Sequence, residues 1–223
     1  MNPIFLDIET APCLRADVRD YLAAKIELPG NISKAETIAA WNAEKRPLAV
    51  AEAVTKTSLD GAFGSVVCIG YDFRDGDTPG TIYGLDERKL LEDFNVTIEE
   101  NVLQSDLFSS TIVGHNVAAF DLRFLVQRYI VNGLKPHPLI ARAAQAKPWE
   151  SEKVYDTMVQ WAGVGNRVGM KKLCLALGIP DTDEVDGNMV AGLVAAGKLA
   201  DVAAHCVADV IKTREVYRRM VFA

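Results

Sequence analysis

The chain has 223 residues, 49% of them hydrophobic, and a formal net charge of −6 at pH 7. This length and apolar content predict one domain with a sizeable core, and the negative charge argues against a protein that wraps long duplex DNA. The apolar runs are too short to span a bilayer. Four scattered cysteines without a C-x-x-C pair, and a first strand that starts almost at Met1 without a charged leader, predict a cytoplasmic protein with reduced thiols.

The first predicted element is a strand at about residues 3–9, where the segment is apolar and β-branched. Asp7 and Glu9 are two apart, so their side chains project from the same face of this strand. Two neighbouring carboxylates repel each other and resist burial, and a pair of hard divalent cations is the usual way to compensate them. The alternative is a strand end at which both acids reach water.

The next part of the sequence predicts helices and then a hairpin. Two or three amphipathic helices are expected between about residues 17 and 56, with breaks at residues 29–31 and at Pro47. Strands are expected at residues 66–73 and 81–83, joined by a turn at residues 75–77. Asp86 is then expected to cap a helix that reaches about residue 104.

The middle of the chain predicts a strand at Thr111, a turn containing Gly114 and Asn116, and a helix from about residue 119 to about residue 132. Asp121 falls in the first turn of this helix. The helix dipole favours an anion there, so Asp121 is interpreted either as a structural residue or as part of an acidic site.

Residues 121–172 carry nine Lys and Arg against four Asp and Glu, in contrast to the acidic chain as a whole. Such a block either guides the phosphates of a nucleic-acid strand or forms an ordinary solvated surface. Within it, Asp156 is interpreted as a helix cap rather than a catalytic residue. Another helix is expected from Lys171.

The last predicted element is a long helix from about residue 199 to about residue 220. His205 and Asp209 are four residues apart and therefore share one face of this helix. Taken alone, the two residues favour an ordinary surface pair.

The order of these motifs resembles the DEDD superfamily of 3′–5′ exonucleases, which have a ribonuclease H-like fold. The closest resemblance is to the predicted 3′–5′ exonucleases related to the proofreading domain of family B DNA polymerases. The superfamily motifs D-x-E, N-x-x-x-F-D and the final Asp are matched here by Asp7, Glu9, Asn116, Phe120, Asp121 and Asp209. The likeness covers the first strand and the chain from about residue 61.

This resemblance implies an α/β fold in which a mixed β-sheet is flanked by α-helices. We expect residues 1–223 to form a single exonuclease domain. Residues from about 11 to 60 are less typical of the family, and we expect them to be a helical insertion. We hypothesise that this insertion forms a flap over the site.

The implied activity is metal-dependent hydrolysis of single-stranded DNA from its 3′ end, with two Mg²⁺ or Mn²⁺ ions and release of nucleoside 5′-monophosphates. By resemblance, Asp7 bridges both metals, Glu9 and Asp209 complete the site of the nucleophilic water, and Asp121 holds the second metal through water. An exoribonuclease and a catalytically decayed nucleic-acid-binding module are the alternatives. A DNA polymerase or repair protein is a candidate partner, and the oligomeric state is left open.

His205 departs from the superfamily pattern. Superfamily members have either a Tyr with three residues before the last Asp or a His with four, whereas His205 has three residues before Asp209. One position of shift turns a helical side chain by about 100°. His205 is therefore expected where the family has its Tyr, either as the general base or water-orienting residue or turned away in a slower enzyme.

The resemblance also implies residues that contact the terminal nucleotide. These are the backbone of Thr10, the side chain of Asn116 and the aromatic ring of Phe120. For Phe120 the alternative is a core residue, because an aromatic side chain at helical spacing is usually buried.

Overall fold

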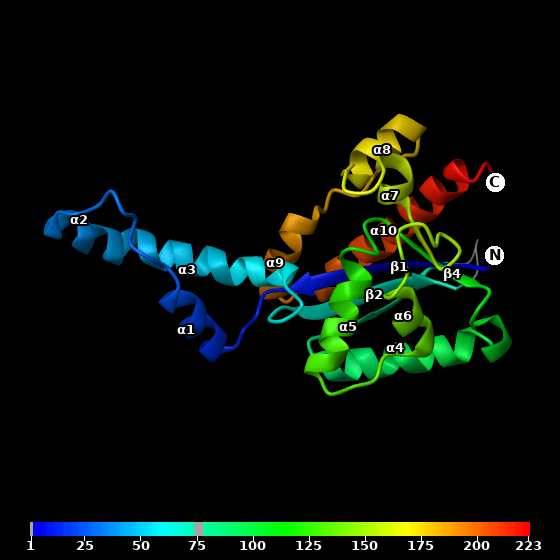
Figure 1. Ribbon diagram of the computed structural model, residues 1–223, viewed down its shortest axis with the longest axis horizontal. Helices are drawn as coiled ribbons and strands as arrows, with labels where there is room; N and C mark the ends of the chain where they lie inside the picture. The colour runs from blue at the N-terminus through cyan, green and yellow to red at the C-terminus, as the bar shows by residue number, and fades with distance from the viewer. Residues whose placement is uncertain (1, 74–77) are drawn as a thin grey trace.

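The computed structural model describes residues 2–73 and 78–223 of the chain. A five-stranded mixed sheet lies at its centre, in the order β3-β2-β1-β4-β5 (Figure 1). The strands are β1 (Asn2–Ala11), β2 (Ser65–Asp72), β3 (Gly80–Tyr83), β4 (Ser110–Gly114) and β5 (Val154–Asp156). Strands β1, β4 and β5 run parallel, while β2 pairs antiparallel with both β1 and β3. The predicted mixed sheet flanked by helices is confirmed.

Helices cover both faces of the sheet (Figure 1). One face is covered by α4 (Glu87–Asn101), α5 (Asp121–Val131) and α6 (Pro138–Ala143). The other is covered by α10 (Leu199–Met220), together with α7 (Thr157–Ala162) and α9 (Gly187–Ala195), while α8 (Met170–Leu177) packs on α10. In the described part of the chain, no helix is both long enough and apolar enough to cross a membrane.

Strand β1 is central because it buries side chains on both faces. Ile4, Leu6 and Ile8 enter the larger core beneath α4 and α5. On the opposite face, Phe5 packs edge-on against Tyr217 of α10, with ring centroids 5.6 Å apart. Since side chains alternate along a strand, Asp7 and Glu9 share the α10 face with Phe5.

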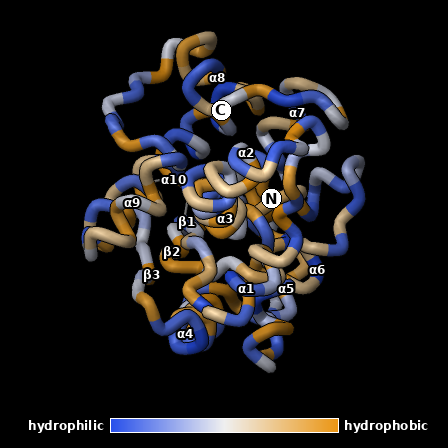
Figure 2. Tube along the Cα trace, turned by 90° about the vertical axis from the view of Figure 1, so that its left-hand side faces the viewer, coloured by the Kyte–Doolittle hydropathy of each residue, from blue (hydrophilic) through white to orange (hydrophobic). Residues whose placement is uncertain are grey.

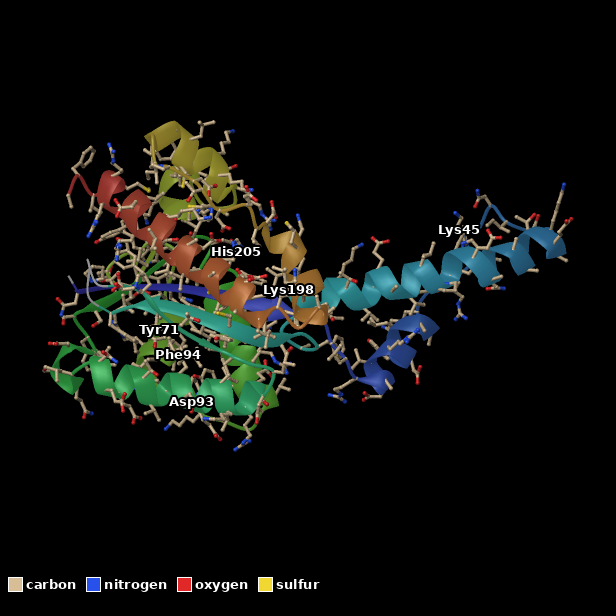
Figure 3. The ribbon with its side chains drawn as sticks, turned by 180° about the vertical axis from the view of Figure 1, so that it is seen from behind. Lys45, Tyr71, Asp93, Phe94, Lys198 and His205 are labelled. Atoms are coloured by element: carbon tan, nitrogen blue, oxygen red, sulfur yellow. The ribbon has the colours of Figure 1, made fainter. Side chains whose placement is uncertain are left out.

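Helix α4 shows the apolar stripe expected of a helix that packs on a sheet. Figure 3 shows Phe94 directed from α4 toward Tyr71 of β2, with Asp93 on the outer side. The two rings lie 6.3 Å apart, and Asp93 pairs with Lys89 at the surface. Figure 2 shows the hydrophilic side of α4 turned outward at the edge of the molecule. The predicted Asp86 cap is confirmed, since its side chain accepts a hydrogen bond from the Lys89 amide at 3.1 Å.

Residues 16–59 form an arm that extends away from the sheet (Figure 1). It contains α1 (Ala16–Ala24), α2 (Ala35–Ala40), a π-helix (Trp41–Lys45), α3 (Arg46–Thr55) and a 3₁₀-helix (Lys56–Leu59). The predicted break at Pro47 is wrong. Pro47 lies in the first turn of α3, where a missing N–H costs little, and the π-helix joins α2 directly to α3.

Other boundaries agree with the sequence to within a few residues, including the helices expected at 119–132 and 199–220. The α4 helix ends at Asn101, earlier than expected, and a separate 3₁₀-helix (Gln104–Asp106) follows. Strand β5 and helices α6 and α9 were not predicted. For β5 and α6 the reason is length, because three to six residues show too little periodicity. The β2–β3 hairpin is present, whereas the turn predicted at residues 75–77 lies outside the described residues.

Helix α10 approaches the sheet closely at Gly70, which pairs with Asp7 across β1 and β2. A Cβ atom at Gly70 would lie 2.8 Å from Cys206 Sγ and 3.0 Å from Val210 Cγ2. The absence of a side chain at this position therefore lets α10 lie directly over β1. This contact sets the distance between the acids of β1 and the residues of α10.

We predict that Gly70→Ala lowers the free energy of unfolding by about 1–3 kcal/mol, because α10 must move outward to admit the methyl group. Gly84→Ala is the matched control, since no atom beyond the adjoining residues lies within 4 Å of the added Cβ there. Urea unfolding of both variants measures the difference. Equal effects at the two glycines would contradict a tight α10–sheet contact.

Candidate active site

A cavity of about 450 Å³ opens where the parallel strands end, and most of the predicted site residues line it. In a sheet with parallel strands, the carboxyl ends of the strands are the usual place for a site. Strand β1, the loop after β4, and helices α5 and α10 contribute its lining. The predicted residues that line it are Asp7, Glu9, Asn116, Phe120, Asp121, His205 and Asp209.

A hydrogen bond fixes Asp121 against β1. The pairing of β1 with β4 covers Asn2 to Phe5, and further along β1 the Ile8 amide donates to Asp121 Oδ1 at 3.0 Å. This bond joins the start of α5 to the strand between Asp7 and Glu9. Asp121 thus has a structural role, and it also lies at the cavity with only 4% of its surface exposed.

The loop that carries Asn116 is held by Asp156 at the end of β5. Asp156 accepts hydrogen bonds from the Asn116 and Ala118 amides at 3.0 and 3.1 Å. It also caps α7 by accepting from the Met158 amide, which confirms its interpretation as a cap. Asn116 has a left-handed φ of 62°, which asparagine tolerates better than most residues. Asp156 is therefore a structural residue that does not line the cavity itself but holds the loop that does.

Burial and mutual repulsion raise the pKa values of three acids in the cavity, Asp7, Glu9 and Asp121. The pKa of Asp7 is well above its usual range. Burial is the largest cause, and the negative charges of Glu9 and Asp121 raise this pKa further. Burial, followed by the charge of Asp209, raises the pKa of Glu9 to about 9. Burial raises the pKa of Asp121 to about 7, against the opposing hydrogen bond from Ile8. A bound cation would relieve these costs.

The residues present fit hard divalent cations, which prefer carboxylate oxygens. Donor atoms of Glu9, His205 and Asp209 all lie within 4.8 Å of one another, close enough to share one ion. Asp7 and Asp121 line the same cavity but do not belong to this close group. The structure thus gathers the four predicted carboxylates and places His205 among them.

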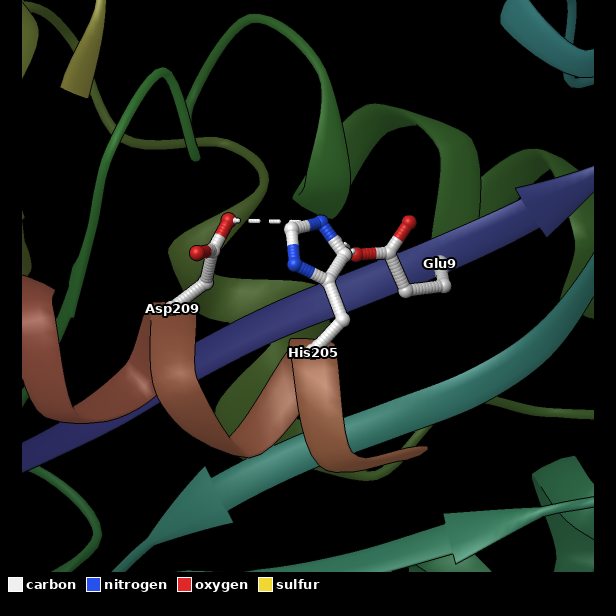
Figure 4. Close-up of side chains that lie close together, drawn as sticks. All are labelled: Glu9, His205 and Asp209. Atoms are coloured by element: carbon white, nitrogen blue, oxygen red, sulfur yellow. Dashed lines mark ion pairs between the residues drawn. The ribbon is translucent and has the colours of Figure 1, made fainter. Parts of the chain in front are cut away.

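The His205 ring lies between two carboxylates, as Figure 4 shows. Its Nε2 atom is 3.3 Å from Glu9 Oε1 and 4.0 Å from Asp209 Oδ2. Its Nδ1 atom is 2.5 Å from Asp183 Oδ2, and only 5% of the side chain is exposed. At its unusual spacing His205 therefore faces the cavity and is not turned away.

Two residues next to the cluster were missed by the sequence analysis. Lys212 is buried, with Nζ 2.5 Å from Asp209 Oδ1 and 3.5 Å from Asp183 Oδ2. Burial lowers the pKa of Lys212, but the neighbouring carboxylates outweigh it and hold the pKa above its ordinary value. Lys212 lies three positions after Asp209 on one helix, so i,i+3 spacing was an available signal. Asp183 lies in a loop and gave no such signal.

Asp183 is held in place by several donors. Burial raises its pKa, but the hydrogen bonds from His205 and the Val185 amide, with the charge of Lys212, outweigh burial and lower it. Asp183 is therefore an ionised acceptor for the His205 ring. It joins the loop before α9 to helix α10.

Thr10 and Phe120 lie at the edge of the cluster. The Thr10 hydroxyl donates to the Ser58 carbonyl at 2.6 Å, so its side chain anchors the end of the arm. Thr10 lines an adjoining cavity of about 490 Å³, which Glu9 and Phe120 also line. Phe120 is half-buried, packs on Phe124 at 5.5 Å and borders both cavities. It thus combines a packing role with an exposed edge at the site.

The basic block is only partly available to a ligand. Arg128 is buried in a bidentate ion pair with Glu87, at 2.9 and 2.7 Å, and ties α5 to α4. Arg142 donates to the Ser110 carbonyl, and Lys153 pairs with Glu150. Of the nine basic residues in the block, all of which the structure describes, Lys171 alone lines the cavity. Three of the nine side chains, those of Arg128, Arg142 and Lys153, are thus held in contacts within the protein.

A family model described as a predicted 3′–5′ exonuclease related to the exonuclease domain of PolB matches residues 61–223. The chain belongs to this family. No curated protein matches the chain. The matched range contains Asp121, His205 and Asp209, whereas Asp7 and Glu9 precede it. The pairing of β1 with β2 and β4 places these two acids beside the matched residues.

The raised pKa values predict an unusual pH dependence of stability. The pKa rises from 4.5 to about 9 for Glu9 and from 3.8 to about 7 for Asp121. Because the folded state retains these protons longer than the unfolded chain, their stabilising contribution is complete below about pH 4 and is lost as the pH rises through 7 and 9.

We therefore expect the Tm in EDTA to fall between pH 6 and pH 9, and saturating Mg²⁺ or Mn²⁺ to reduce this fall, because a cation favours the ionised carboxylates. Thermal denaturation at several pH values tests this. Glu9→Gln removes one titrating group and should flatten the EDTA profile. Parallel profiles with and without metal would contradict the prediction.

Proposed function

We propose that the protein is a metal-dependent 3′–5′ exonuclease that removes nucleotides from the ends of single-stranded DNA. The observation that carries this proposal is the convergence of Asp7, Glu9, Asp121 and Asp209 on one cavity, three of them with raised pKa values. Membership in a family of predicted 3′–5′ exonucleases supports the direction of attack. The four carboxylates are the residues that would hold the cations.

Divalent cations bound there would supply a water of lowered pKa and neutralise charge on the scissile phosphate. The protein fixes the ligands in advance. The Ile8 amide holds one oxygen of Asp121, and Lys212 holds one oxygen of Asp209. Both acids also line the cavity. Such preorganisation lowers the cost of assembling the site.

The shape of the site suits a single-stranded end. Cavities of about 450 and 490 Å³ adjoin at Glu9 and Phe120, and each has the size of a small-molecule site. Phe120 is partly exposed and borders both cavities, so its ring offers a surface for a base, and base–aromatic contacts are tolerant of sequence. Lys171 lines the first cavity and provides a positive charge for a phosphate. Few phosphate contacts are needed, which is compatible with an acidic protein.

We predict that 5′-labelled single-stranded DNA is shortened from its 3′ end in Mg²⁺ or Mn²⁺ and is left intact in EDTA. Asp7→Asn should reduce the rate by at least about a hundredfold, because it removes one charged oxygen from the buried cluster. Asp201→Asn is the matched control, since Asp201 is an exposed acid in the first turn of the same long helix that carries His205.

An RNA strand of the same sequence is digested in parallel. Faster shortening of RNA would replace the DNA assignment with that of an exoribonuclease. Binding of either strand without cleavage, with metal demonstrably bound, would overturn the enzymatic proposal and favour a nucleic-acid-binding module.

A further inference from the structure

The position of the His205 ring matches that of a metal ligand. Ligands about 2.1 Å from one ion lie about 3.0 Å apart at adjacent positions of an octahedron and about 4.2 Å apart at opposite ones. Nε2 lies 3.3 Å from Glu9 Oε1 and 4.0 Å from Asp209 Oδ2. Both separations fall within this span. Since the donor atoms of Glu9, His205 and Asp209 all lie within 4.8 Å of one another, small movements of the side chains would let one ion contact all three.

A water between His205 and Glu9 would need more room. Two hydrogen bonds of about 2.8 Å through a water hold the outer atoms about 4.5 Å apart. At 3.3 Å, Nε2 and Oε1 are too close for this. The His205 ring is thus next to the carboxylate of Glu9, with no room for a bridging water between them.

The surroundings of His205 also follow the pattern of metal-binding histidines. Such a histidine donates its second ring N–H to a carboxylate, which fixes its orientation and leaves the other nitrogen free for the metal. Asp183 Oδ2 lies 2.5 Å from Nδ1 and occupies this place. Lys212 lies 3.5 Å from the same Asp183 oxygen and 2.5 Å from Asp209 Oδ1. Asp209 Oδ2 is thereby directed toward the ring.

We propose that His205 binds the divalent cation directly through Nε2, beside Glu9 and Asp209, with Asp183 as the residue that positions its ring. This inference rests on the proposed metal-dependent function. Mg²⁺ takes oxygen ligands almost exclusively, whereas an imidazole nitrogen favours first-row transition ions. The site should therefore prefer Mn²⁺ to Mg²⁺, more strongly than a site built of carboxylates alone.

Pulsed electron paramagnetic resonance of the full chain with one equivalent of Mn²⁺ tests this directly. We expect nitrogen modulation from a bound imidazole, and ¹⁵N-histidine labelling should change it to the ¹⁵N pattern. The signal should vanish in His205→Gln. It should persist in His137→Gln, which alters a helix cap away from the cavity, and in His115→Gln, whose ring nitrogens contact Thr157 and Val168. These are the three histidines of the chain.

Affinities give a second readout. His205→Gln should reduce the preference for Mn²⁺ over Mg²⁺ by about tenfold, measured by calorimetric titration of both ions. Asp183→Asn keeps the ring and should weaken Mn²⁺ about tenfold while nitrogen modulation remains. Circular dichroism confirms that each variant is folded. If His205→Gln does not fold, the labelled wild-type spectrum still decides the question.

Bound Mn²⁺ without histidine nitrogen modulation in the wild type would overturn the ligand assignment. If DNA is nevertheless shortened in a metal-dependent way, the proposed function stands and His205 acts on water instead. No Mn²⁺ binding and no nuclease activity would overturn both proposals together.

Discussion

The burial of acidic side chains on β1 is the constraint on which the site depends. Asp7 and Glu9 lie on the face of the sheet that α10 covers, and Asp121 and Asp209 reach the same cavity from two helices. Carboxylates in such a setting lose hydration and repel one another. Groups of the protein offset part of this cost, namely the Ile8 amide, the Cys206 thiol and the Lys212 ammonium.

This compensation is uneven. Lys212 neutralises the Asp209 side of the cluster, whereas in the described part of the chain neither Asp7 nor Asp121 forms an ion pair with a lysine or arginine. The Cys206 thiol donates to Asp7 Oδ2 at 3.3 Å, which is a weak interaction for a buried charge. When Asp7 and Asp121 ionise, their charge is therefore largely uncompensated by the protein, and a cation bound in the cavity would neutralise it. A purely structural explanation of the cluster leaves that cost unexplained.

Long-range contacts bring the site together. Gly70 admits α10 close to β1, and an ion pair of 2.7 Å between Arg214 and Asp72 ties the same helix to β2. The arm separates β1 from the family-matched range, yet Thr10 and the end of the 3₁₀-helix are joined by the Thr10–Ser58 hydrogen bond. Segments far apart in the sequence are thus held at fixed distances before any ligand binds.

The sequence by itself determined the type and approximate limits of the long elements, because β1 is a continuous apolar and β-branched run and α5 and α10 carry helical apolar periodicity. It also determined that Asp7 and Glu9 share a face, since alternation along a strand is local. Short elements such as β5 were missed, because a three-residue strand is recognised only by its pairing with β4 and not by its own sequence pattern.

The tertiary structure alone decided which residues surround the cluster. Asp183 is 22 positions from His205, and Asp156 is 40 positions from Asn116. No local spacing in the sequence therefore predicts either contact. Arg128 belonged to a basic block by sequence but is buried against Glu87. The physical reason is common to these cases. Hydrogen bonds and ion pairs between distant segments depend on how the chain packs. The periodicity of a sequence shows only which face of a single segment is apolar.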